Sequence, residues 1–196
     1  MVEHPIHIHP YDKIDLNIIG GESVYPNEYI DYLIHFHGDR DYFECHEILE
    51  DYWKKVDPKN KHSIWVGLIL LAVSNYHHRR GNISGAKKTL SKSIQIFKNN
   101  YEQIEHLGLN KKKFLLELEK RQTSLLKGCQ YTSYIFPIMD TFLLTSCKDK
   151  CIQAGLNWCK DSDLSNSDIV HRHSSRDRSQ VIHERLMALK TKAQAP

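Results

Sequence analysis

Three side chains that can bind a metal or move a proton lie close together in the stretch His46-Glu47-x-x-Glu50. Imidazole and carboxylate groups are common ligands of zinc and other divalent metals, and a carboxylate beside an imidazole can serve as a general base. The spacing is close to that of the zinc motif H-E-x-x-H, but Glu50 stands where that motif has its second histidine. His46 and Glu50 could therefore ligate a metal, with Glu47 as general base, if a third ligand comes from elsewhere in the chain.

The element that must position these residues is a helix predicted over residues 42–56. At 100° per residue, His46 falls inside the apolar arc of this helix, between Phe43 and Trp53, and Glu50 falls at the shoulder of the arc. Burying an unpaired charge costs free energy, so both polar side chains need partners. Each can be the partner of the other, because side chains four residues apart meet on a helix. The pattern predicts a buried His46–Glu50 pair, which either binds a metal or is a structural pair that fixes the register of the helix.

Histidines from other predicted helices could complete a metal site. His35 and His37 lie near the end of the first predicted helix, and His77 and His78 lie near the end of the third. At a helix C-terminus, His77 and His78 can instead interact favourably with the helix dipole. The candidate metal ligands are His46, Glu50, His77 and His37, for zinc, manganese or iron, and the sequence establishes no cofactor. The candidate binding residues around them are Phe43, Trp53, Tyr76 and His78.

Apolar positions at spacings of three and four residues, interrupted by glycine, proline and capping residues, predict a series of helices and no strand. The predicted helices cover residues 26–38, 42–56, 63–80, 83–108, 110–128 and 137–154, with a last helix that carries Ile182, Leu186 and Leu189. The third is apolar on all sides for most of its length, as expected for the centre of a bundle. The sequence therefore predicts an all-α fold, a compact helical bundle of about five to seven helices built around a helical-hairpin core.

The chain divides into three predicted parts, and the last of them contains a basic segment. Residues 1–24 show no clear period and are expected to form a poorly ordered extension, whereas residues 25–108 form the helical core with the His-Glu motif. Residues 109–196 form a C-terminal helical region whose last helix is basic, with six basic and two acidic residues between positions 171 and 192. That excess could meet phosphate or an acidic partner, but a solvated helix face is the favoured interpretation. Nucleic-acid binding is not expected, because no aromatic side chains interleave with the basic ones.

Composition excludes several classes of protein. Hydrophobic residues make up 40% and charged residues 26% of the 196 residues, a mixture typical of a globular protein rather than a disordered one. The longest apolar stretch, residues 64–73, is about half the length that a membrane span needs, so no membrane association is expected. The first residues lack the basic start and apolar run of a secretory signal, which predicts a cytoplasmic protein.

Several segments together resemble a known family. The stretch Tyr-Phe-Glu-Cys-His-Glu-Ile-Leu-Glu-Asp-Tyr-Trp, residues 42–53, resembles the signature of domain-of-unknown-function family 309. Further segments that resemble it are Gly67-Leu68-Ile69 through Ala72, Tyr76-His77, and Arg80-Gly81-Asn82 to Gly85-Ala86, so that the match covers about residues 27–100. The stretch His-Phe-His-Gly-Asp-Arg-Asp, residues 35–41, resembles a subgroup of the same family.

The resemblance implies a small all-α bundle, and members of the family are sometimes labelled predicted metal-dependent hydrolases because of their His/Glu cluster. The family positions carried over to this chain are Phe43, His46, Glu47, Glu50, Trp53, Gly67, His77, Gly81 and Ala86. Many members have glutamines beside the Gly-Leu-Ile segment, where this chain has Val66 and Leu70. This difference implies a drier site and weakens the case for hydrolysis.

Two hypotheses follow for the function. The favoured one is a structural or interaction module, in which His46 and Glu50 form a buried polar pair and the function lies in binding a protein partner or a second copy of the chain. The alternative is a metal-dependent hydrolase, with His46 and Glu50 as ligands, Glu47 as general base, and His77 or His37 completing the site.

Overall fold

The computed structural model describes residues 25–172, and these form helices joined by loops, with no β-strand among them. The elements in chain order are α1 Asn27–Ile34, a π-helical turn His35–Asp39, α2 Tyr42–Val56, α3 Ile64–Arg79, α4 Ile83–Asn99, α5 Gln103–His106, α6 Lys111–Leu126, α7 Thr141–Gln153 and α8 Ser167–Val170. The predicted all-α bundle is confirmed. The predicted extension, residues 1–24, and the predicted basic last helix lie outside the described residues.

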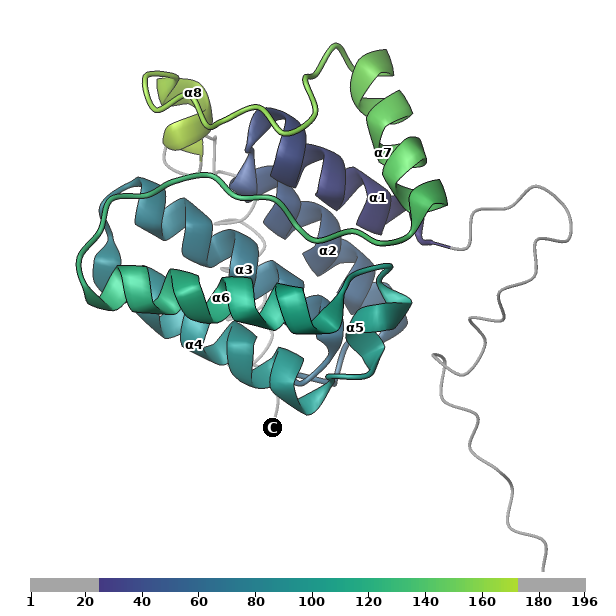
Figure 1. The fold of residues 1–196 in the computed structure, drawn as a ribbon, viewed down its shortest axis with the longest axis horizontal. Coiled ribbons are helices and arrows are strands. Elements are labelled where there is room, and N and C mark those ends of the chain that lie inside the picture. The colour runs from purple at the N-terminus through teal and green to yellow at the C-terminus, as the bar shows by residue number, and fades with distance from the viewer. Residues whose placement is uncertain (1–24, 173–196) are drawn as a thin grey trace, which may run out of the picture.

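The helices pack against one another in a continuous series. Contacts run from α6 to α4, α3, α2, α1 and α7, and the most extensive are those of α3 with α4 and with α2 (Figure 1). Most residues of α3 are buried, as the apolar pattern of this segment predicts. At Gly67, α4 comes so close that an added Cβ would lie 3.1 Å from side-chain atoms of Ile96 and Phe97. The pair α3 and α4 is thus the hairpin at the centre of the bundle.

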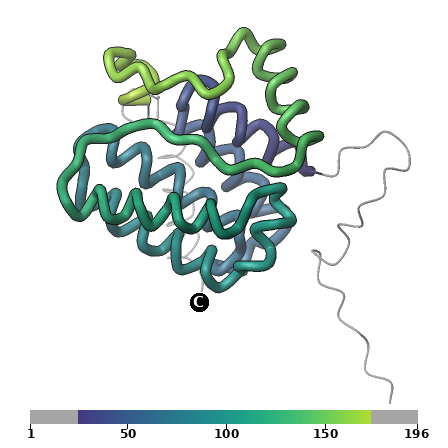
Figure 2. Tube along the Cα trace, in the orientation of Figure 1, coloured from purple at the N-terminus to yellow at the C-terminus, as the bar shows by residue number. Residues whose placement is uncertain are grey.

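Residues 127–140, here called the strap, run back across the face of the bundle and connect α6 to α7. The strap can be followed as a continuous green tube between these two helices (Figure 2). Tyr134 and Phe136 of the strap are buried, and their rings lie 5.5 and 4.3 Å from the ring of Phe36. The rings of Tyr32 and Tyr42 lie 5.7 and 5.2 Å from the ring of Phe36. These five residues, Tyr32, Phe36, Tyr42, Tyr134 and Phe136, form an aromatic cluster that joins the strap to α1, the π-helical turn and α2.

Several predicted helix boundaries are correct because local capping signals set them. Asp41 accepts a hydrogen bond from the backbone N–H of Glu44 at the start of α2, and Asn110 accepts one from that of Lys113 at the start of α6. Both are ordinary N-caps, which satisfy backbone donors that have no partner inside the helix. The glycines expected to close helices, Gly81 and Gly128, have positive φ angles of 74° and 72°. Such angles favour glycine because it has no Cβ.

Two other predicted boundaries are wrong, and one short helix is not predicted. The segment 83–108 divides into α4 and α5, because the side chain of Asn100 donates to the carbonyl oxygen of Ile96 at the end of α4. The segment 137–154 becomes helical only at Thr141, where Asp140 is the N-cap, since the residues before it belong to the strap. The short helix α8 lies in a polar stretch for which no helix is predicted. No helix among residues 25–172 is long and apolar enough to cross a membrane.

Gly38 has a different role from the helix stop that the sequence predicts. The residue with a left-handed backbone here is Arg40, with φ 59°, whereas Gly38 has no positive φ. A Cβ on Gly38 would lie 3.2 Å from the Sγ of Cys151 and 3.3 Å from Leu156. Gly38 therefore lets the chain after α7 approach the π-helical turn, and Arg40 ends that turn.

Candidate functional site

His46, Glu47 and Glu50 come together on one turn of α2. The Nδ1 of His46 lies 3.0 Å from a carboxylate oxygen of Glu47, and its Nε2 lies 3.2 Å from one of Glu50. One donor atom from each residue can be chosen so that all three lie within 4.8 Å of one another. Among the residues that the structure describes, this is the one group of three His, Cys, Asp or Glu side chains close enough to hold a metal ion. We call it the triad.

The triad is not buried, so the prediction of a buried His46–Glu50 pair is wrong. The side chains of His46, Glu47 and Glu50 retain 27%, 35% and 31% of their exposure, whereas Phe43 and Trp53 on either side of His46 are buried. A helical wheel gives the direction of a side chain, but it does not show whether another element covers that direction. Solvent reaches the triad, and a dissolved ion could reach it as well.

The hydrogen bonds of the triad allow a metal-binding arrangement of its donors. A neutral imidazole has one N–H, so it donates to one carboxylate and leaves its other nitrogen free to act as a ligand. If Nδ1 donates to Glu47, the lone pair of Nε2 and a carboxylate oxygen of Glu50 lie side by side and can act as two metal ligands. A metal-ligating histidine almost always donates its second ring N–H to a group such as a carboxylate. These two donors suit zinc, manganese or iron, and the described residues place no third ligand within reach once Glu47 orients the imidazole.

A pocket of about 290 Å³ opens next to the triad, between α2 and α3. Its walls are mainly aromatic and aliphatic, and the lining residues are Tyr42, Phe43, His46, Val73, Tyr76, His77 and Arg80. We call it the α2–α3 pocket. Of the predicted binding residues it contains Phe43 and Tyr76, and it contains the predicted ligand His77, whose Nδ1 lies 3.2 Å from the side-chain nitrogen of Asn82. Val66 and Leu70 do not line it, so these substitutions do not make it drier.

His37 is not part of the site, and its prediction as a metal ligand is wrong. The side chain is fully buried, its Nδ1 donates to the carbonyl oxygen of Leu33 at 2.8 Å, and its Nε2 accepts from the backbone N–H of Phe136 at 3.0 Å. Burial lowers the pKa of His37 to about 3. Because both ring nitrogens are occupied, no lone pair remains for a metal. His37 is instead a neutral connector between α1 and the strap.

Two predicted binding residues lie away from the pocket. The Nε2 of His78 lies 2.9 Å from the carbonyl oxygen of Cys129, so His78 contacts the beginning of the strap. The indole N–H of Trp53 donates to the carbonyl oxygen of Asn60 at 3.1 Å, and the ammonium of Lys61 lies 4.4 Å from the centre of its ring. Trp53 thus closes the loop between α2 and α3. Neither side chain lines the α2–α3 pocket, so the structure does not support their assignment as binding residues.

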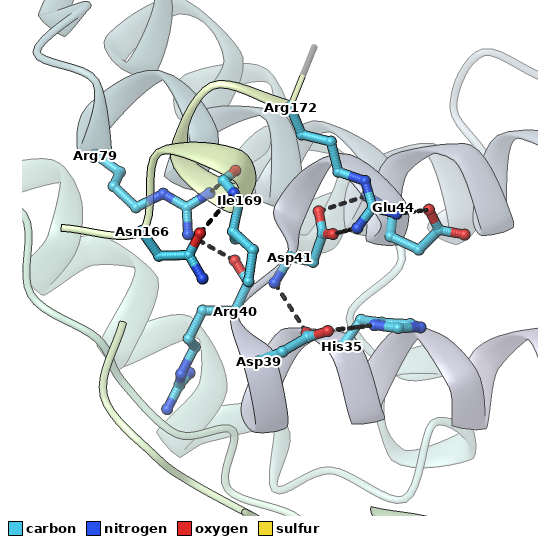
Figure 3. Close-up of polar contacts among 9 residues, drawn as sticks. All are labelled: His35, Asp39, Arg40, Asp41, Glu44, Arg79, Asn166, Ile169 and Arg172. Atoms are coloured by element: carbon cyan, nitrogen blue, oxygen red, sulfur yellow. Dashed lines mark hydrogen bonds and ion pairs between the residues drawn. The ribbon is translucent and has the colours of Figure 1, made fainter. Parts of the chain in front are cut away.

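Sequence reasoning missed a polar layer at the start of α2, which Figure 3 shows in close-up. The carboxylate of Asp41 is fully buried and pairs with the guanidinium of Arg172, which also lies 3.8 Å from Glu44 (Figure 3). The neighbouring Asp39 pairs with His35 at 3.0 Å. Burial lowers the pKa of His35, but the hydrogen bond and charge of Asp39 raise it by more, so the net shift is upward. The end of the described chain is thereby fixed to the helix that carries the triad.

Arg40 and Arg79 complete this layer with hydrogen bonds to backbone carbonyl groups. The guanidinium of Arg79 donates to the carbonyl oxygens of Arg40, at 2.7 Å, and of Ile169, at 3.0 Å (Figure 3). Arg40 donates from its own guanidinium to the carbonyl oxygens of Phe36, Tyr134 and Lys160. The signal that could have found this layer is the charged stretch at residues 35–41, which resembles a family subgroup. Without the fold, however, nothing in that stretch shows that its arginine is buried.

Comparisons with known proteins place these features in a family. The family described as "Domain of unknown function (DUF309)" matches residues 29–89, a range that contains the triad and every residue of the α2–α3 pocket. The chain is also 44% identical, over 162 residues, to a Bacillus subtilis (strain 168) protein called "Uncharacterized protein YpuF". That alignment covers 83% of this chain and 93% of the relative. The comparison with solved structures found no match. The chain belongs to the family of the domain of unknown function DUF309.

Proposed function

We propose that the protein is a metal-dependent hydrolase in which His46 and Glu50 hold a divalent metal beside the α2–α3 pocket. The observation that carries the proposal is the position of the triad, which is accessible to solvent and shares His46 with a pocket that has apolar walls. Binding sites for small molecules commonly combine apolar walls with a few polar groups at defined positions. A structural pair inside the core would need neither solvent access nor a pocket.

The proposal gives each residue of the triad one role. His46 Nε2 and a carboxylate oxygen of Glu50 are the ligands, and when bound, a divalent ion supplies Lewis-acid assistance by polarising a carbonyl or phosphoryl oxygen. Glu47 accepts the Nδ1–H of His46 and so orients the imidazole, as its 3.0 Å contact supports. This geometry favours Glu47 as a positioning residue over the general base expected from the H-E-x-x-H comparison.

The walls of the α2–α3 pocket supply the remaining contacts to a substrate. Phe43, Val73 and Tyr76 would hold an apolar group and exclude water from it. Arg80 lies at the same pocket, with its guanidinium donating to the hydroxyl of Tyr76 at 2.8 Å and placed 5.1 Å from the centre of that ring. A substrate with an apolar body and an anionic end fits this set of groups.

Metal binding tests the proposal directly. We expect the full chain to bind about one equivalent of zinc, manganese or iron, and replacement of a ligand in His46→Ala or Glu50→Gln to abolish this binding. Glu47→Gln should weaken it by about 10- to 100-fold, because it removes the group that orients the imidazole. The measurement is titration calorimetry with elemental analysis. His4, His7 and His9 are replaced by glutamine in every protein, because histidines this close together in the sequence can bind metal by themselves.

A matched control for this titration is Asp51→Asn, which removes one negative charge from the exposed side of the same helix without touching the triad. Its metal affinity should equal that of the parent protein. Folded parent protein that binds none of the three metals, or binds them equally well after His46→Ala, would refute the hydrolase proposal.

The second candidate is an interaction module, and one observation favours it. Both ring nitrogens of His46 contact carboxylates, and an imidazole that carries both N–H groups donates to Glu47 and to Glu50. Glu50 also pairs with Lys54 at 3.1 Å, so in that form the triad is satisfied within the chain. In that case Glu50→Gln removes only partly exposed ion pairs, each of which contributes about 0.3–0.5 kcal/mol on a helix. Urea unfolding in the presence of chelator should then show a loss below about 1 kcal/mol. A larger loss would mean that the triad has a structural role that its exposure does not explain.

A further inference from the structure

A second pocket, separate from the triad, lies between α6, the strap and the chain after α7. Its volume is about 300 Å³, and its lining residues are Arg40, Glu117, Arg121, Ser133, Tyr134, Ile135, Cys159 and Asp161. We call it the arginine pocket. It shares no lining residue with the α2–α3 pocket, and the metal proposal makes no use of it.

Arg40 brings a buried positive charge to this pocket. Its side chain is only 1% exposed, and none of the described carboxylates lies within 4.0 Å of its guanidinium nitrogens. In Figure 3 the side chain is turned away from the neighbouring Asp39 and Asp41. Nε and Nη1 donate to three backbone carbonyl groups, whereas Nη2 makes no hydrogen bond within the described part of the chain. Nη2 is not among the fully buried side-chain atoms that lack a partner in the described residues, so solvent or a dissolved anion can reach it. Buried charges in proteins are normally paired, and Nη2 is the donor of Arg40 at which an anion can pair with it.

Arg121 presents a second free donor to the same pocket. Its Nε donates to Glu117 at 2.7 Å, and its Nη1 donates to the carbonyl oxygen and the hydroxyl of Thr132 at 2.9 and 2.7 Å. These contacts, together with the ring of Tyr134 4.4 Å away, fix the plane of the guanidinium. Its Nη2 has no hydrogen-bond partner among residues 25–172. Two arginines that line one pocket and are held by other contacts thus each keep one terminal nitrogen without a partner among the described residues.

We infer that the arginine pocket binds the oxyanion of a small molecule, a phosphate or carboxylate group, between the Nη2 donors of Arg40 and Arg121. The guanidinium group suits both anions because its planar array of donors matches the geometry of their oxygens. Two carboxylates also line the pocket. The carboxylate of Glu117 accepts a hydrogen bond from Arg121. Asp161 is an exposed residue, and the charge of its carboxylate repels an anion in the pocket.

The experiment is titration calorimetry of the full chain with inorganic phosphate and, separately, with acetate. We expect saturable binding of at least one of the two anions, with about one equivalent bound. Arg121→Gln should weaken it by about tenfold or more, because a charge-assisted hydrogen bond is lost. Asp161→Asn should strengthen it, because a negative charge is removed from the lining. Tighter binding of phosphate would identify a phosphoryl ligand, and tighter binding of acetate a carboxylate ligand.

Arg121 is the variant of choice because Arg40 also holds three backbone carbonyl groups, and its replacement could unfold the protein. The matched control is Lys120→Gln, which removes the same charge from the adjacent position of α6, outside the pocket. It should bind the anion as the wild type does. The inference is overturned if folded wild-type protein binds neither anion, if Arg121→Gln binds as well as wild type, or if Lys120→Gln loses as much affinity as Arg121→Gln. Each of these outcomes leaves the metal proposal untouched.

Discussion

Lowering the pH from 7 to 5 is expected to reduce the free energy of unfolding by about 2 kcal/mol through His37 alone, and by about 4 kcal/mol at pH 3. Burial lowers the pKa of this histidine to about 3 in the folded protein, whereas in the unfolded chain it has its ordinary value near 6.5. Between these two values the unfolded chain binds a proton that the folded protein does not bind. Stability is therefore lost as the pH falls through this range.

Urea unfolding at pH 7, 6 and 5 measures this effect, and His37→Gln isolates it. Glutamine retains one donor and one acceptor but does not titrate, so the variant is less stable at pH 7 yet lacks this part of the pH dependence. The difference between the two proteins cancels the other groups, including His35, whose raised pKa stabilises the fold at low pH and loses that effect as the pH rises. If the variant loses stability with acid as steeply as the wild type, His37 is not the group responsible.

Replacing Phe36 with alanine should cost about 3–5 kcal/mol of stability, the usual result of removing a fully buried aromatic ring. Phe36 lies at the centre of the aromatic cluster, where it contacts residues of α2 and of the strap. The variant would lose the burial of its own ring and leave a cavity beneath the strap. Many single domains have only 5–15 kcal/mol of stability in total, so the melting temperature should fall sharply.

The matched control for this prediction is Phe142→Ala, which removes the same side chain from α7 where it is 51% exposed. Its cost should stay within about 0.5–1 kcal/mol, since little buried surface is lost. Both variants can be compared by urea unfolding at neutral pH. Equal losses would contradict the assignment of Phe36 as the centre of the core.

The sequence predicts those parts of the fold that capping residues and prolines determine locally. Helix α2 runs over the predicted residues, because Asp41 begins it and Asp57-Pro58 follows its last turn. The sequence predicts both ends of the strap as helix. The path of the strap depends instead on Tyr134 and Phe136 packing against Phe36, about a hundred positions earlier in the chain. Periodicity within one segment does not contain that information.

The candidate site could be predicted to a similar extent. The placement of His46, Glu47 and Glu50 on one helical face follows from their spacing, and the structure confirms that they meet. Their exposure could not be predicted, because it depends on which other elements cover α2. The prediction of His37 as a metal ligand is wrong for the same reason, since its partners, Leu33 and Phe136, are defined only by the fold. Arg40 was missed because a charged residue in a polar stretch is normally exposed.

The long separation between Phe36 and Phe136 also has a consequence for biosynthesis. At about 5–20 residues per second, a ribosome needs roughly 5–20 s to add the residues that lie between them. From residue 89 to the end of that interval, the nascent chain contains the whole family-matched segment, residues 29–89, but not the strap residues that bury its aromatic side chains. Newly made chains therefore expose these aromatic side chains before the strap can bury them. Because exposed apolar surface favours aggregation, this is the period in which a chaperone would be of most use.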